Sequence, residues 1–140
     1  LSLPFMRTLD LTKVDISLLL LEDFFRIKEK MFQENLGVDT SFVGSNFSKG
    51  EFNRKGILKL LKAYGEVVYK KGFDFQQQYE TTKKMDKVLK SRPEIWSSYL
   101  KLLKKIDQLV KNNLLFSEYT KVYPSPEMQI EWLSPKKKVL

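Results

Sequence analysis

The chain has 140 residues, 42% of them hydrophobic, which is enough for one hydrophobic core and too few for two domains of ordinary size. It contains no cysteine and no histidine, which excludes disulfides, thiolate nucleophiles, the commonest zinc ligands and the commonest general base. The formal net charge is +8, and such a surplus indicates acidic partners. We therefore predict a single non-catalytic domain that needs no metal and no cofactor.

The positive charge is concentrated in the middle of the chain. Residues 49–113 hold 16 basic and 7 acidic groups, a net charge of +9, whereas residues 1–48 hold 5 basic and 7 acidic groups. No stretch approaches the roughly 20 consecutive apolar residues of a transmembrane helix, so no transmembrane segment is predicted. The sequence starts with Leu1 instead of Met, which fits a processed mature chain and an excised domain equally well.

The N-terminal residues 1–11 include Pro4 and show no helical period, which predicts an extended arm. A helix is then predicted over residues 12–36, because Thr12 and Asp15 form a capping box and Gly37 is a natural stop. Its apolar residues cover an arc of about 200° on a helical wheel, so we expect it to be the spine of a bundle with that arc buried. The arc contains Val14, Ile16, Leu18, Leu20, Leu21, Phe24, Phe25, Ile27, Met31 and Phe32.

Opposite this arc, Glu22 and Glu29 lie on one side of the helix with Arg26 between them. This spacing favours ion pairs over a catalytic carboxylate pair. No second helix supplies a matching pair of glutamates. We therefore predict no catalytic residue in the chain.

Further helices follow a polar connection over residues 38–47. The second is predicted from the Ser48–Glu51 capping box to about Lys71, and the third from Asp74 to about Lys90. The fourth begins at Ser91–Glu94, where Pro93 falls in the first turn, and ends near Asn113. Beyond it the Tyr, Thr and Val content favours a break over residues 114–123. A short helix from Ser125 to about Leu133 and a frayed tail over 134–140 complete the chain.

These elements predict an all-α fold, an up-down-up-down four-helix bundle. Residues 1–113 are expected to form the arm and the bundle, and residues 114–140 an appended C-terminal segment. The helix stripes also predict the buried positions. The predicted core is Leu20, Phe24, Ile27, Ile57, Leu61, Tyr64, Val68, Trp96, Tyr99, Leu103, Ile106 and Val110.

Lysines recur on the outer sides of the second, third and fourth helices, away from each apolar stripe. The chain has 21 Lys and 4 Arg, a ratio that suits point-charge docking more than base recognition. We predict that these lysines dock onto an acidic protein surface, with Trp132 as a candidate exposed anchor; a merely solvated face is the alternative. The predicted docking residues are Lys55, Lys59, Lys62, Lys70, Lys83, Lys84, Lys87, Lys101, Lys104, Lys105, Lys111 and Trp132.

An arm with Pro4, four antiparallel helices with lysine-rich outer faces, and the absence of Cys and His together resemble the PsbQ-type extrinsic subunits of photosystem II. The resemblance covers about residues 1–113 and is one of architecture. It implies a processed, peripheral protein of the thylakoid lumen that docks on a membrane complex and supports oxygen evolution without chemistry of its own. Residues 114–140 depart from that family's plan. A second hypothesis is a helical bundle that binds nucleic acid, such as a viral coat protein or a replication accessory.

Overall fold

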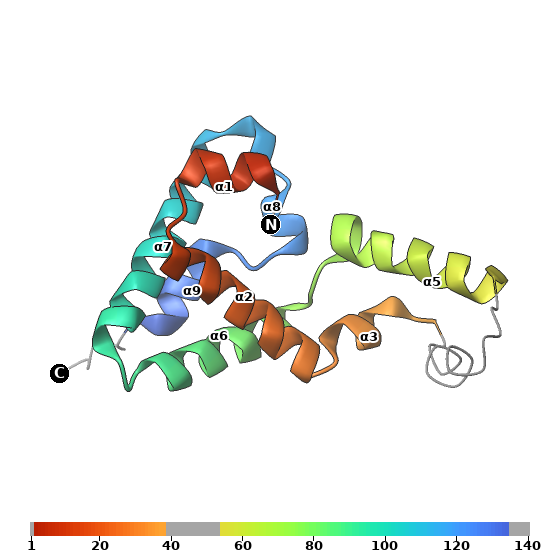
Figure 1. Cartoon of the computed structure of the whole chain (residues 1–140), viewed down its shortest axis with the longest axis horizontal. Helices are drawn as coiled ribbons and strands as arrows, with labels where there is room; N and C mark the ends of the chain where they lie inside the picture. Colours follow the sequence, from red (N-terminus) through yellow and green to blue (C-terminus); the bar gives the residue numbers. More distant parts are fainter. Residues whose placement is uncertain (1, 39–53, 135–140) are drawn as a thin grey trace.

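The structure is a computed structural model that describes residues 2–38 and 54–134, and within these ranges every regular element is helical (Figure 1). The predicted all-α class is therefore confirmed. The elements are α1 (Leu3–Leu9), α2 (Lys13–Lys28), α3 (Met31–Leu36), α5 (Arg54–Glu66), the π-helical turn η1 (Val67–Lys71), α6 (Phe75–Leu89), α7 (Pro93–Asn112), the 3-10 turn η2 (Leu114–Phe116), α8 (Tyr119–Val122) and α9 (Pro126–Leu133).

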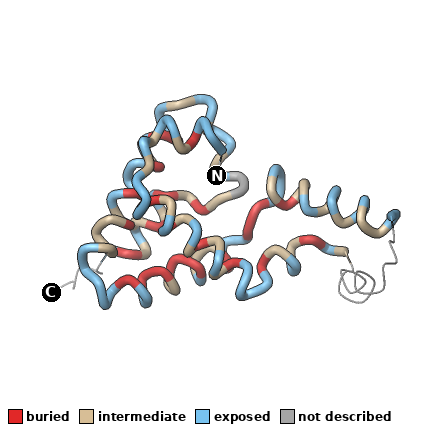
Figure 2. The backbone as a smooth tube through the Cα atoms, in the orientation of Figure 1, coloured by how far each residue is buried: buried red, intermediate tan, exposed pale blue. Residues whose placement is uncertain are grey.

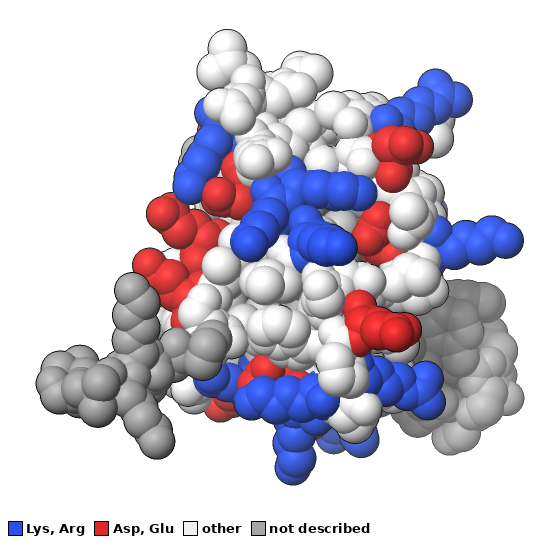
Figure 3. All heavy atoms as spheres, turned by 90° about the vertical axis from the view of Figure 1, so that its left-hand side faces the viewer, with Lys and Arg blue, Asp and Glu red and all other residues white. Residues whose placement is uncertain are grey.

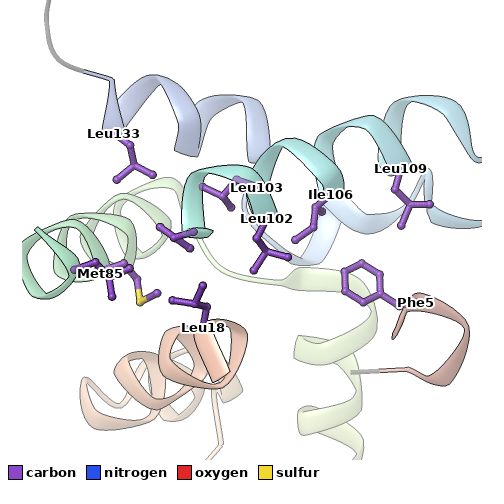
Figure 4. Packing of buried hydrophobic residues seen from close by; sticks show 10 residues of the cluster. Phe5, Leu18, Met85, Leu102, Leu103, Ile106, Leu109 and Leu133 are labelled. Atoms are coloured by element: carbon purple, nitrogen blue, oxygen red, sulfur yellow. The ribbon is translucent and has the colours of Figure 1, made fainter. Parts of the chain in front are cut away.

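The hydrophobic core lies around α7, which packs against α2, α6 and α9. Tyr99, Leu102, Leu103 and Ile106 of α7 are almost completely buried, and so is Met85 of α6. Figure 4 shows side chains from α1, α2, α6 and α9 converging on this helix. The apolar stripe predicted for the fourth helix is thus the one that forms the centre of the protein.

The helix α5 does not take the place that the bundle prediction gives it. It packs on α3 and η1, and none of its residues is buried. The helix that lies beside both α6 and α7 is α9, from the segment predicted to be an appendage (Figure 1). Its Gln129 and Leu133 are buried, so this segment is part of the core. The four-helix up-down-up-down arrangement is not confirmed.

The N-terminal segment is helical, so the predicted extended arm is wrong. The Ser2 side chain accepts a hydrogen bond from Phe5 N at 3.4 Å, and Pro4 lies in the first turn, where its missing N–H costs nothing. Phe5 is buried, and its ring packs 5.9 Å from both Phe116 and Tyr119. The Ser-x-Pro start and the two aromatic contacts of Phe5 account for a helix without an amphipathic period.

The predicted start of the spine helix is confirmed and its continuity is wrong. Thr12 and Asp15 form the reciprocal capping box, with N···O distances of 3.0 and 3.1 Å. The helix stops at Lys28, and α3 begins only at Met31, because Lys30 adopts a left-handed conformation with φ of 57°. Gly37 ends α3 with φ of 64°, as predicted.

The face that α2 buries is also different from the predicted one (Figure 2). Its buried residues are Asp15, Leu18, Glu22 and Arg26, spaced three or four residues apart. Apolar residues cover most of the circumference of α2, so they do not by themselves decide which side faces inward. The polar stripe can be buried because its side chains find hydrogen-bond partners on other helices. Leu18 and Met31 of the predicted arc are buried, whereas Val14, Leu20, Phe24 and Ile27 are exposed.

Of the twelve predicted core residues, Tyr99, Leu103 and Ile106 are confirmed as buried. Leu20, Phe24 and Ile27 are wrong because α2 is turned the other way. Leu61 and Tyr64 are wrong because α5 lies outside the core. Four further residues are partly buried: Ile57, Val68, Trp96 and Val110.

Local signals set the remaining boundaries well. Asp74 caps α6 and accepts a hydrogen bond from Gln77 N at 2.8 Å. The cap of α7 is Arg92 instead of Ser91, whose hydroxyl donates to Val88 O. The break predicted after α7 is confirmed by η2 and α8, and α9 matches the predicted C-terminal helix. The Ser48–Glu51 capping box and most of the tail lie outside the described residues.

Candidate functional sites

The predicted docking lysines lie in two places far apart on the molecule. Lys55, Lys59 and Lys62 belong to α5, at one end of the longest axis of the molecule in Figure 1, with Lys70 following in η1. The others belong to α6 and α7, and α7 lies at the opposite end. The structure therefore splits the single predicted surface into an α5 set (Lys55, Lys59, Lys62 and Lys70) and an α6–α7 set (Lys83, Lys84, Lys87, Lys101, Lys104, Lys105 and Lys111).

Four lysines of the α6–α7 set are engaged within the chain. The ammonium of Lys83 donates to the Trp132 carbonyl at 2.8 Å. The other three form ion pairs: Lys84 with Glu29, Lys105 with Asp15 at 3.6 Å, and Lys111 with Asp107 at 2.9 Å and Glu127 at 3.4 Å. These contacts link the helices to one another and lower the net charge that these side chains present to a partner.

The other seven predicted docking lysines are exposed and form no ion pair with a described carboxylate. They are Lys55, Lys59, Lys62, Lys70, Lys87, Lys101 and Lys104. Figure 3 faces the α7 side of the molecule and shows basic side chains gathered at its centre and along its lower edge, between patches of acidic ones. Leu58 and Leu61 of α5 are also exposed, so apolar side chains lie between the α5 lysines along the sequence.

Trp132 is not the exposed anchor that the sequence suggested. It is half-buried, and its ring packs edge-on against Phe75 and Tyr79 at 5.3 Å from each. It borders a cavity of about 680 Å³ between α6, α7 and α9, where Trp96 Nε1 donates to Asp86 Oδ1 at 2.9 Å. Burial alone would raise the pKa of Asp86, but hydrogen bonds from Lys90 and Trp96 lower it overall.

A buried polar network joins α2 to α7 and α9, and the sequence did not reveal it. Glu22 Oε1 accepts hydrogen bonds from the Tyr99 hydroxyl and from Gln129 Nε2, the latter at 3.1 Å. Gln129 also reaches Thr82 Oγ1 at 3.2 Å. Burial and then the charge of Glu22 raise the pKa of Tyr99 well above its usual value, so this phenol stays a hydrogen-bond donor.

The second oxygen of Glu22 faces Arg26, whose side chain is only 2% exposed. Arg26 Nη2 lies 3.2 Å from Glu22 Oε2, and Arg26 Nη1 lies 2.7 Å from Asp23 Oδ1. The guanidinium carbon lies 5.3 Å from the centre of the Phe73 ring. Burial opposes the charge on Arg26, but Glu22 and Asp23 outweigh it and raise the pKa. The predicted ion pairing of Glu22 is thus confirmed, and Glu29 pairs with Lys84.

A cavity of about 400 Å³, called here the tyrosine cavity, lies beside this network. Residues from α1, α2, η1, η2 and α8, and from positions that flank these elements, line it. The described part of the lining contains three carboxylates, one guanidinium and five aromatic rings. Its lining residues are Ser2, Phe5, Leu19, Glu22, Asp23, Arg26, Val68, Tyr69, Leu115, Phe116, Glu118, Tyr119 and Tyr123.

The tyrosines of this cavity are in an acidic environment. Burial and then the charge of Glu22 raise the pKa of Tyr119, and burial and then the charge of Asp23 raise the pKa of Tyr123. The only sequence signal for the site was the Glu22–Arg26 spacing, because Tyr69, Tyr119 and Tyr123 come from segments without a clear period.

Comparison with protein-family models, with curated proteins and with solved structures found no match to this chain. Among the described residues, no group of three or more Asp or Glu side chains is placed to hold a metal ion. None of the described helices is both long enough and apolar enough to cross a bilayer.

Proposed function

We propose that this protein is a non-catalytic binding or assembly protein that docks onto an acidic partner through exposed lysines. The observation that carries the proposal is the set of seven exposed lysines that form no ion pair with a described carboxylate. An exposed ammonium keeps its hydration and rotamer freedom, so these side chains contribute little to stability. They are free to meet carboxylates or phosphates of a partner.

The two lysine sets suit an assembly role. The α5 set and the exposed lysines of the α6–α7 set lie toward opposite ends of the molecule, so two acidic surfaces can be engaged at once (Figure 1). Lys101 and Lys104 project from a helix whose other side forms the core, which gives them a rigid support. On α5, exposed Leu58 and Leu61 add apolar contact area beside the charges.

The carboxylates of the tyrosine cavity support a non-catalytic role. Glu22 accepts hydrogen bonds from three side chains, and Asp23 forms an ion pair with Arg26. These contacts give both carboxylates a structural role as hydrogen-bond acceptors within the protein. The PsbQ-type resemblance, and with it a place in the thylakoid lumen, stays a prediction; the proposal needs only an acidic partner.

Binding of a fluorescent polyglutamate peptide, followed by anisotropy, tests the proposal. The α5 variant carries Lys55, Lys59 and Lys62 changed to Glu, and the α7-side variant carries Lys87, Lys101 and Lys104 changed to Glu. A control variant with Lys13, Lys28 and Lys30 changed to Glu alters the net charge equally, at exposed positions outside both sets. Like charges brought within 4 Å in water cost about 1 kcal/mol each, so each lysine-set variant should weaken binding by at least about tenfold.

The wild-type affinity should fall with salt, since the Debye length shrinks from about 10 Å at 0.1 M to about 3 Å at 1 M. If the control variant loses as much affinity as the other two, only the net charge matters and the proposal fails. A single-stranded oligonucleotide of equal charge is the second ligand. Tighter binding of this oligonucleotide, lost in the same variants, would select the nucleic-acid hypothesis instead.

A further inference from the structure

We propose that the tyrosine cavity binds an organic ammonium cation, such as a quaternary or methylated ammonium group. The geometry behind the proposal is a 400 Å³ cavity in which aromatic rings and carboxylates are combined. Ligand pockets in proteins span about 300–1,000 Å³, so a trimethylammonium group with a short chain fits this volume. Nothing in the lysine-docking proposal requires such a site.

The aromatic part of the lining is continuous. Phe5 stacks on Tyr119 at 5.9 Å between ring centres, and Tyr119 stacks on Tyr123 at 5.1 Å. Phe116 meets the edge of Phe5 at 5.9 Å, and Tyr69 lines the cavity from η1. The electron-rich faces of phenol and phenyl rings attract cations that carry little hydration, and quaternary ammonium ions are the clearest examples.

The charge of the lining is opposite to that of the chain. The whole sequence has 25 basic and 17 acidic residues, yet in the described lining of the cavity two carboxylates, Glu22 and Asp23, share one guanidinium, that of Arg26. No lysine lines it. Arg26 is held by Glu22 and Asp23 and lies over the Phe73 ring, so its charge is matched within the protein. Burial is the main reason why the pKa values of Tyr119 and Tyr123 are raised, and the charges of Glu22 and Asp23 raise them further. These two carboxylate charges also favour a bound cation.

Titration of the full chain with choline, followed by calorimetry at fixed ionic strength, tests the proposal. The matched ligand is 3,3-dimethyl-1-butanol, which has the shape of choline and no charge. We expect saturable binding of choline and at least tenfold weaker binding of the alcohol. Equal binding of the two, or no saturable binding of choline, would overturn the inference.

Two variants locate the site without risk to the fold. Tyr69 is 80% exposed, so Tyr69→Leu should fold normally and weaken choline binding by about fivefold through the lost ring face. Tyr64→Leu, on the neighbouring α5 and outside the cavity, is the control and should leave the affinity unchanged. Equal effects of both changes would contradict the assignment. A peptide with one trimethyllysine is titrated in parallel. Tighter binding of this peptide than of choline would indicate that the cation comes from a partner side chain, and tighter binding of choline would indicate a free small molecule.

Discussion

Replacing Tyr99 with Phe removes one hydroxyl from the centre of the buried network and leaves the ring in place. The ring of Tyr99 is completely buried, so its packing in the core is unchanged by the substitution. What is lost is the hydrogen bond to Glu22 Oε1 and a longer contact of 3.4 Å from Gln129. Glu22 keeps Gln129 and Arg26 as donors, so its charge is not left without partners.

The expected cost follows from the charge on the acceptor. A hydrogen bond to a charged group contributes roughly 1.5–3 kcal/mol, and we expect Tyr99→Phe to lower the free energy of unfolding by about 2 kcal/mol. For a chain of 140 residues, an unfolding entropy of about 2.1 cal/mol/K per residue converts this loss into a fall of about 7 °C in Tm.

Thermal and urea unfolding, followed by circular dichroism, measure this change. Tyr64→Phe is the matched control, because Tyr64 lies on α5 outside the core and its hydroxyl is not part of the network. Its unfolding free energy should stay within about 0.5 kcal/mol of the wild-type value. If Tyr99→Phe is as mild as this control, Glu22 is not held by Tyr99 and the inward orientation of the α2 polar stripe is wrong.

Three further predictions concern the core, the Trp96–Asp86 contact and pH. Ile106→Ala should destabilise the protein by about 2–4 kcal/mol in urea unfolding, since Ile106 is buried at the centre of α7; a loss below about 0.5 kcal/mol would contradict this. Trp96→Phe removes the indole donor to Asp86 and should lower the free energy of unfolding by about 1–2 kcal/mol at pH 7. This loss should be smaller at low pH, where Asp86 is protonated, because the lowered pKa of Asp86 stabilises the fold only above about pH 4. At high pH the unfolded state releases its phenol protons near pH 10, whereas Tyr119 stays protonated in the fold, so the unfolding free energy should fall above pH 10. Tyr119→Phe should make that fall shallower, and identical pH profiles would refute the raised pKa.

The features that the sequence predicted correctly are those set by a few neighbouring residues. The capping boxes at Thr12 and Asp74 and the stop at Gly37 depend on hydrogen bonds and backbone angles within one turn. The α7 core stripe is equally local, because its apolar arc is narrow and only one orientation buries it.

The orientation of α2 could not be predicted, because its apolar residues cover so much of the helix that several faces could pack inward. The choice is made by Tyr99 and Gln129, which lie 77 and 107 residues from Glu22 in the chain and satisfy its carboxylate. The break at Lys30 had no signal either, since Lys is an ordinary helix former, yet Lys30 adopts a left-handed conformation. The tyrosine cavity could not be predicted either, because its lining brings together residues as far apart in the sequence as Ser2 and Tyr123.

The most direct test of lysine-directed docking is the ratio of two dissociation constants for the polyglutamate peptide at 0.1 M salt. One belongs to the α7-side variant with Lys87, Lys101 and Lys104 reversed, the other to the control with Lys13, Lys28 and Lys30 reversed. Both variants carry the same net charge, so the ratio isolates the position of the charges. We predict that the α7-side variant binds at least about fivefold more weakly than the control, from about 1 kcal/mol of additional repulsion. A ratio of one would contradict the account, since the peptide would then respond to net charge alone.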